Sequence, residues 1–183
     1  IANKSIVQTH LFYLNLMDDI YSTYRAVQPG ETPFPFTDVP ESRWSYPYIR
    51  QLYDAGVVSG MTATTFAPAE NMTRAQFVTM LAGLQGADVS AYKTGKFTDV
   101  PADAWYAPYV SWAAENGVVY GVSDTAFAPN ADISRQDMAV MVYRYAERFG
   151  IRLGTDVPPV TFADAGDIAA YALPAVQALQ RAG

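Results

Sequence analysis

The sequence contains no cysteine, which excludes disulfides, thiol nucleophiles and cysteine-ligated metal sites. Basic residues are few, since 12 Lys and Arg stand against 18 Asp and Glu, and the formal net charge is −6. Nucleic acid and anionic membrane surfaces are recognised through a basic field, so neither partner is expected. No apolar run approaches the ~18 residues of a membrane-spanning helix.

Signatures of catalysis are also missing from the 183 residues. The only histidine, His10, has no metal-type partner nearby, and no Ser-His-Asp arrangement or Gly-rich phosphate loop is present. We therefore expect no enzyme activity, no catalytic residues, no metal and no other cofactor. The chain opens at Ile1 on "IANKS", which lacks the basic start and apolar centre of a signal peptide, and we interpret it as a processed or excerpted piece.

What the chain does contain is a long internal repeat. The segment from Phe36 reads FTDVPESRWSYPYIRQLYDAGVVSGMTATTFAPAENMTRAQ, and the segment from Phe97 repeats it without insertion. Repetition on this scale is typical of small units that stack or pack in a ring. A constant offset of 61 residues relates Trp44 to Trp105, Gly60 to Gly121 and Arg74 to Arg135.

A third, partial copy begins at Phe162, and its Tyr171 occupies the tryptophan position of the other copies. The copies and the turn-rich segments between them divide the chain into four parts. We expect an N-terminal helix and linker at 1–30, repeat 1 at 31–95, repeat 2 at 96–157 and a partial repeat 3 at 158–183.

Each full repeat is expected to form a loop, a helix, a second loop and a second helix, so the predicted fold class is all-α. In the first helix, Trp44, Tyr48, Leu52 and Ala55 follow helical spacing, and Gly56 ends the helix. The equivalent stripe in repeat 2 is Trp105, Tyr109, and Trp112 or Ala113.

The second helices are expected to start at Thr73 and Ser134. Thr73 with Gln76 predicts a capping box, and Ser134 with Asp137 predicts its acidic variant. Because the partial repeat lacks a second helix, we expect an apolar gap near Val176 and Leu179. The N-terminal helix is proposed to cover that gap through Met17, Ile20 or Tyr24.

The pattern FTDVP, Trp, GVVxG, FAP and TRAQ or SRQD resembles the S-layer homology repeats of bacterial surface proteins. The resemblance covers about 36–145 fully and 162–183 in part. It implies three repeats packed as a pseudo-threefold bundle, whose grooves hold secondary cell-wall polymers, often sugars bearing a ketal-linked pyruvate. By this resemblance, the ligand-binding residues are Arg74, Arg135, Trp44, Trp105, Gly60, Gly121 and Tyr171.

The chain also departs from the family pattern. Gln76 and Asp137 replace the glutamate of the motif, Tyr171 replaces a tryptophan, and the third arginine helix is absent. These departures put the third groove in question and favour "cell-wall polysaccharide" over a specifically pyruvylated polymer.

Arg74 and Arg135 raise a question of their own, because a cation at the first position of a helix opposes the helix dipole. One explanation is an anion site beside free helix N–H groups. The other is an internal ion pair with Asp38 or Asp99 of a neighbouring repeat, and both alternatives stay open.

The tryptophans and the repeated aspartates also allow two interpretations each. Trp44 and Trp105 either pack at a repeat interface or line a sugar groove. Asp38, Asp99 and Asp164 are expected in Asx-type turns or helix caps, because catalytic acids would need two different environments and these recur as copies.

The sequence as a whole predicts a module that attaches a bacterial surface protein to the cell wall without covalent bonds. The expected partner is a secondary cell-wall polysaccharide or peptidoglycan-linked polymer, and the expected location is the bacterial cell surface. The alternative is an assembly module of a surface lattice or appendage, completed by another segment or chain of the same protein.

Overall fold

The computed structural model describes residues 33–93 and 95–183. The helix expected in 1–30 and the contacts expected of His10, Met17, Ile20 and Tyr24 lie outside these residues and stay predictions. The all-α prediction is confirmed within the described part. Its helices are α2 (Tyr46–Asp54), α3 (Arg74–Gln85), α4 (Ala107–Glu115), α5 (Arg135–Phe149) and α6 (Leu173–Ala182), with a 3-10 turn, η1, at Ala165–Asp167.

The helices keep the 61-residue offset of the sequence. α2 and α4 match at both ends, and α3 and α5 match at their first residues, although α5 extends further at its C-terminal end. Each of the first helices α2, α4 and α6 carries a proline in its first turn: Pro47, Pro108 and Pro174. Proline suits this position because its fixed φ is helical and its missing N–H is not needed there. The α2–α3 and α4–α5 units therefore share one plan, and α6 repeats its first half.

Two aspartates brace the loops of the full repeats. The carboxylate of Asp38 accepts the backbone N–H groups of Phe66 and Ala67 at 2.9 and 2.7 Å. Asp99 does the same for Phe127 and Ala128 at 2.8 and 2.7 Å. These bonds span 28 and 29 residues. The expectation of a local Asx turn or helix cap at these two positions is thus wrong, because the carboxylates connect the loop before the first helix of a repeat to the loop between its two helices.

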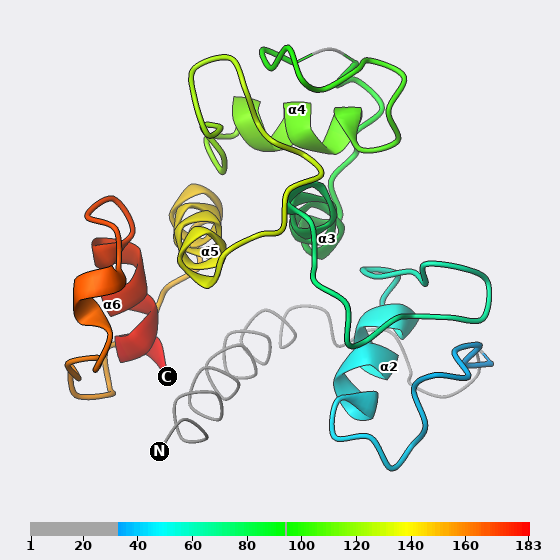
Figure 1. Cartoon of the computed structure of the whole chain (residues 1–183), viewed down its shortest axis with the longest axis horizontal. Helices are drawn as coiled ribbons and strands as arrows, with labels where there is room; N and C mark the ends of the chain where they lie inside the picture. Colours follow the sequence, from blue (N-terminus) through cyan, green and yellow to red (C-terminus); the bar gives the residue numbers. More distant parts are fainter. Residues whose placement is uncertain (1–32, 94) are drawn as a thin grey trace.

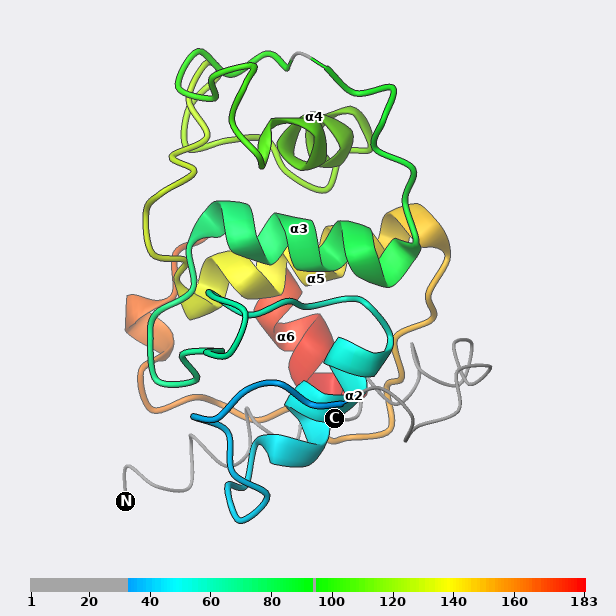
Figure 2. The ribbon, with the colours of Figure 1, turned by 90° about the vertical axis from the view of Figure 1, so that its right-hand side faces the viewer.

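Successive repeats interlock. α3 packs against α4 and also touches α5, and α5 packs against α6, so the second helix of a repeat contacts the first helix of the next. Figure 1 shows α2, α4 and α6 placed around the central α3 and α5, which Figure 2 shows side by side. The arrangement agrees with ring packing of the copies, while a threefold symmetry stays a prediction.

Backbone bonds reinforce this interlocking at the start of α3. The N–H of Arg74 donates to the carbonyl of Ala131 at 2.9 Å, and that of Ala75 donates to Pro129 at 3.0 Å. The next copy returns a bond from the N–H of Ile133 to the carbonyl of Met72 at 2.9 Å. The N–H groups of Arg74 and Ala75, which the sequence suggested as part of an anion site, are therefore occupied by protein carbonyls.

The apolar stripe expected on the first helices is wrong at its N-terminal end. The chain becomes helical only at Tyr46 and Ala107, so Trp44 and Trp105 lie in the preceding turn, where their side chains are 61% and 59% exposed. Ile49 of α2 and Trp112 of α4 are the large buried side chains instead. Packing of the two tryptophans in a core is thereby excluded.

Each of the second helices buries an apolar face. Phe77, Leu81 and Leu84 of α3 are buried, as are Met141, Val142 and Tyr145 of α5, and together they form most of the central apolar cluster. Leu179 of α6 belongs to the same cluster and is only 2% exposed, so it is not part of an open apolar gap. What residues 1–27 contribute there stays a prediction.

Candidate functional site

A groove of about 380 Å³ lies where the first, second and third copies meet. Its lining combines α3, the turn after α4, α5 and the loop before α6. The lining residues are Arg74, Val119, Tyr120, Gly121, Val122, Asp137, Val140, Met141, Arg144 and Tyr171. Three of the residues predicted to bind ligand, Arg74, Gly121 and Tyr171, are therefore brought together from three different copies.

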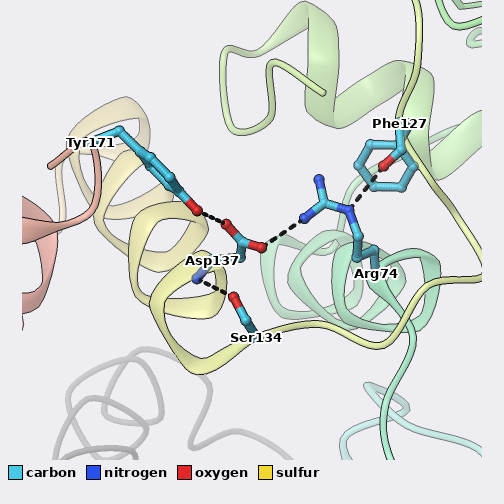
Figure 3. Close-up of polar contacts among 5 residues, drawn as sticks. All are labelled: Arg74, Phe127, Ser134, Asp137 and Tyr171. Carbon is cyan, nitrogen blue, oxygen red and sulfur yellow. Dashed lines mark hydrogen bonds and ion pairs between the residues drawn. The ribbon is translucent and has the colours of Figure 1, made fainter. Parts of the chain in front are cut away.

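Arg74 forms part of the wall of this groove with its guanidinium largely buried, at 5% exposure. Its Nε donates to the carbonyl oxygen of Phe127 at 2.9 Å, and its Cζ lies 5.0 Å from the centre of the Phe127 ring (Figure 3). Burial lowers the pKa of Arg74, while the nearby Asp137 carboxylate opposes that effect. An arginine stays protonated even so, and Arg74 is a fixed cation.

The partner of Arg74 is Asp137 of α5. Arg74 Nη1 lies 3.3 Å from Asp137 Oδ2, whereas the expected partners Asp38 and Asp99 hold backbone N–H groups and do not form this pair. The internal ion pair considered from the sequence therefore exists with a different acid. Asp137 is partly exposed, because 28% of its side chain is accessible.

Asp137 also receives the hydroxyl of Tyr171, whose O–H donates to Asp137 Oδ1 at 2.7 Å (Figure 3). Burial and then this hydrogen bond raise the pKa of Tyr171, so the phenol keeps its proton at neutral pH. The Tyr171 side chain remains 57% exposed and offers much of its ring to the groove. Arg74, Asp137 and Tyr171 thus form one chain of polar contacts across three copies.

These contacts explain why the predicted capping box of α5 is only half formed. Ser134 Oγ accepts the N–H of Asp137 at 3.2 Å, as expected. The Asp137 carboxylate does not return to Ser134, because it binds Arg74 and Tyr171 instead. In α3 both halves of the box are present, since Thr73 and Gln76 cap each other.

Gly121 shapes the floor of the turn that borders the groove. Its backbone φ is +92°, a value that residues other than glycine rarely adopt. A Cβ at this position would lie 2.5 Å from the Ala126 carbonyl oxygen and 2.6 Å from a ring carbon of Phe97. Gly60 is equally crowded in the first copy, where an added Cβ would meet Phe36 and the carbonyl of Thr62, but it does not line this groove.

Two further side chains of the groove, Tyr120 and Arg144, were not predicted from the sequence. The Arg144 guanidinium carbon lies 4.2 Å from the centre of the Tyr120 ring, which is 58% exposed. The first copy has Ser59 and Gly83 at the equivalent positions. A comparison of the two copies for differences, rather than for matches, could have found this pair.

The remaining predicted ligand residues, Arg135, Trp44, Trp105 and Gly60, do not line the groove. Arg135 is exposed at the start of α5, and the two tryptophans are exposed on the turns before α2 and α4. Their predicted roles in ligand binding stay proposals. Within the described residues, no group of His, Cys, Asp and Glu could hold a metal ion, and no helix is long and apolar enough to cross a membrane.

Comparison with known proteins accounts for the repeated architecture. The S-layer homology domain family matches residues 35–78 and 96–139, and each match runs from the loop before the first helix into the start of the second. The chain carries two S-layer homology domains. Both matches include the helix-start arginine of their copy, Arg74 or Arg135.

Relatives with S-layer homology domains include surface-layer proteins and enzymes. The chain is 31% identical over 107 residues to an S-layer protein of Bacillus thuringiensis subsp. finitimus, which is 58% of this chain and 13% of that protein. It is 38% identical over 144 residues to an endoglucanase of Bacillus sp. (strain KSM-635), covering 79% of this chain and 15% of the endoglucanase. An amylopullulanase of Thermoanaerobacterium thermosulfurigenes is 30% identical over 152 residues, covering 83% of this chain and 8% of the relative.

The chain therefore spans less than a sixth of the length of these relatives. What the different relatives have in common with it is the S-layer homology region, which is an anchoring module rather than a catalytic one. This places the chain at the bacterial cell surface in association with the cell wall, as part of the attachment of a surface protein.

Proposed function

We propose that the groove lined by Arg74, Gly121 and Tyr171 binds an acidic secondary cell-wall polysaccharide and thereby anchors the parent protein. The observation that supports this most is that these residues come from three copies and meet in one groove of about 380 Å³. The S-layer homology matches support the same kind of partner, a polymer attached to the wall.

The chemistry of the lining suits a charged sugar. Tyr120 and Tyr171 expose large parts of their rings, and such amphipathic rings can cover the apolar face of a sugar while bonding to its hydroxyls. Two arginines and one aspartate line the groove, so its formal charge is positive although the whole chain is acidic. A local positive charge of this kind favours an anionic ligand.

A pull-down with purified cell-wall sacculi tests the proposal. The chain is expected to bind sacculi that retain their secondary polymer and to lose that binding when the polymer is removed. Tyr171→Ala should weaken the binding, while Tyr48→Ala, which removes an aromatic side chain outside the groove lining, should not. Binding that survives polymer removal would contradict the proposal and favour contacts with peptidoglycan or with other copies of the surface protein.

A further inference from the structure

We propose that Arg144, held against the ring of Tyr120, is the residue that receives the acidic group of a carboxylated sugar in this groove. This inference rests on the proposed function and identifies the residue that meets the charge. It differs from the expectation drawn from the sequence, in which the helix-start arginine Arg74 has that role.

Arg74 is poorly placed to serve as the main partner of an incoming acid. Its guanidinium is buried, donates Nε to the Phe127 carbonyl and pairs with the Asp137 carboxylate. An acidic group that approached Arg74 would also approach the Asp137 carboxylate, which already neutralises the charge of Arg74. Like charges at close range oppose binding. Arg74 therefore serves chiefly to hold the groove together.

Arg144 is in the opposite situation. Its side chain lines the same groove and is only half-buried, and within 33–93 and 95–183 it forms no ion pair with a carboxylate. Its guanidinium carbon lies over the Tyr120 ring, 4.2 Å from the ring centre. A cation–π contact of this kind leaves the N–H edge of the guanidinium available, and it restrains the side chain so that less freedom is lost on binding.

The first copy shows that this pair is not needed for the fold. Gly83 occupies the position of Arg144 there, and a Cβ on Gly83 would lie 3.2 Å from the carbonyl oxygen of Val57. Helix and turn are thus in close backbone contact in the first copy. In the second copy the equivalent positions hold Arg144 and Tyr120, and Tyr120 is 58% exposed. The replacements of Ser59 by Tyr120 and of Gly83 by Arg144 thus occur together, and both change the lining of one groove.

The test measures affinity for purified wall polymer in two forms, native and with its carboxylates converted to amides by carbodiimide coupling with methylamine. Arg144→Ala should lose about 10- to 100-fold in affinity for the native polymer, the range for a charge-assisted bond. The parent chain should bind the amidated polymer more weakly than the native polymer. For the amidated polymer, Arg144→Ala should cause little further loss of affinity. Arg144→Lys should recover only part of the loss, because an ammonium lacks the planar fork.

Arg148→Ala is the matched control, since Arg148 is an exposed arginine of the same helix outside the groove lining. Tyr120→Ser, which installs the residue of the first copy, should weaken native binding less than Arg144→Ala. The role of Arg144 would be overturned if Arg144→Ala bound native polymer as tightly as the parent chain does. It would also be overturned if the variant lost the same affinity for the native and the amidated polymer. A parent chain that binds neither sacculi nor polymer would instead overturn the proposed function itself.

Discussion

Arg74 of the first copy donates its Nε hydrogen to the carbonyl oxygen of Phe127 in the second copy, 2.9 Å away, and lies against the ring of the same residue. The contact connects the start of α3 to the loop that Asp99 braces through the N–H of Phe127. The backbone of Phe127 thus accepts a hydrogen bond from Arg74 of the preceding copy and donates one to Asp99 of its own copy. Arg74 is therefore expected to contribute to stability as well as to the groove.

Arg74→Ala should lower the free energy of unfolding by about 1–3 kcal/mol, the range for leaving buried polar partners unsatisfied. Arg135→Ala, at the equivalent but exposed position of the second copy, should change it by less than ~0.5 kcal/mol. Urea denaturation followed by circular dichroism measures both values. Equal effects of the two substitutions would show that burial of Arg74 between copies contributes nothing.

Asp137→Asn should affect binding and stability in opposite directions. Removal of the carboxylate leaves the buried Arg74 cation without its partner, so the variant should unfold at lower denaturant concentration. The same change removes the one carboxylate of the groove lining, and affinity for native polymer should rise by up to about fivefold, equivalent to ~1 kcal/mol.

Asp124→Asn is the control for this prediction, because Asp124 is exposed in the second copy and lies outside the groove lining. Titration calorimetry with the wall polymer gives the affinities. A fall in affinity on Asp137→Asn would mean that the carboxylate itself contacts the sugar.

Gly121→Ala should be more damaging than the same change at another glycine with positive φ. Gly150 ends α5 at φ +70° with nothing within 4 Å of an added Cβ, so Gly150→Ala should cost about 1–2 kcal/mol from backbone strain alone. Gly121→Ala adds a clash with the Ala126 carbonyl and the Phe97 ring, worth about 1–3 kcal/mol more. Thermal unfolding of the two variants should separate clearly, and similar melting temperatures would contradict the geometry of the turn.

Acid should weaken the loop closure made by Asp38. The N–H of Phe66 and then other backbone donors lower the pKa of Asp38, although desolvation works against them. A lowered pKa in the folded state means that the stabilisation is complete at neutral pH and is lost as the pH falls below about 4, through the folded pKa.

Asp38→Asn should therefore be less stable than the parent at pH 7, and the difference should shrink as the pH falls through that window. Denaturation curves at several pH values measure it, with Asp103→Asn as an exposed control that also removes one charge. A difference between parent and Asp38→Asn that is independent of pH would contradict a role for the ionised carboxylate.

The repeat itself explains how much of the fold could be read from the sequence. The 61-residue offset predicted that α2 and α4 would share bounds, and the caps at Thr73 and Ser134 located the starts of α3 and α5, because these are local signals. Trp44 was misplaced for a local reason as well, since helical spacing alone does not show where a helix begins. Pro47, three residues later, marks the first turn of α2 and was the local signal that placed Trp44 before the helix.

The site was less predictable, because its contacts join residues of different copies. Arg74 was expected beside free N–H groups, but the loop carbonyls of Pro129 and Ala131 fill that end of α3, and only the packed structure brings them there. The partner of Arg74, Asp137, is 63 residues away in the chain. Nothing in the spacing distinguished this acid from Asp38 or Asp99.

Force on an anchored surface protein would be transmitted to the wall through the same contacts between copies that form the groove. Arg74, Gly121 and Tyr171 belong to three successive copies, so the separation of any one copy would dismantle the groove that we propose to hold the polymer. Under tension, the lifetime of attachment would then depend on how fast the copies come apart as well as on how fast the sugar dissociates. The hydrogen bonds from the start of α3 to the loop carbonyls, and the bond from Arg74 to Phe127, would then resist the separation of the copies under load.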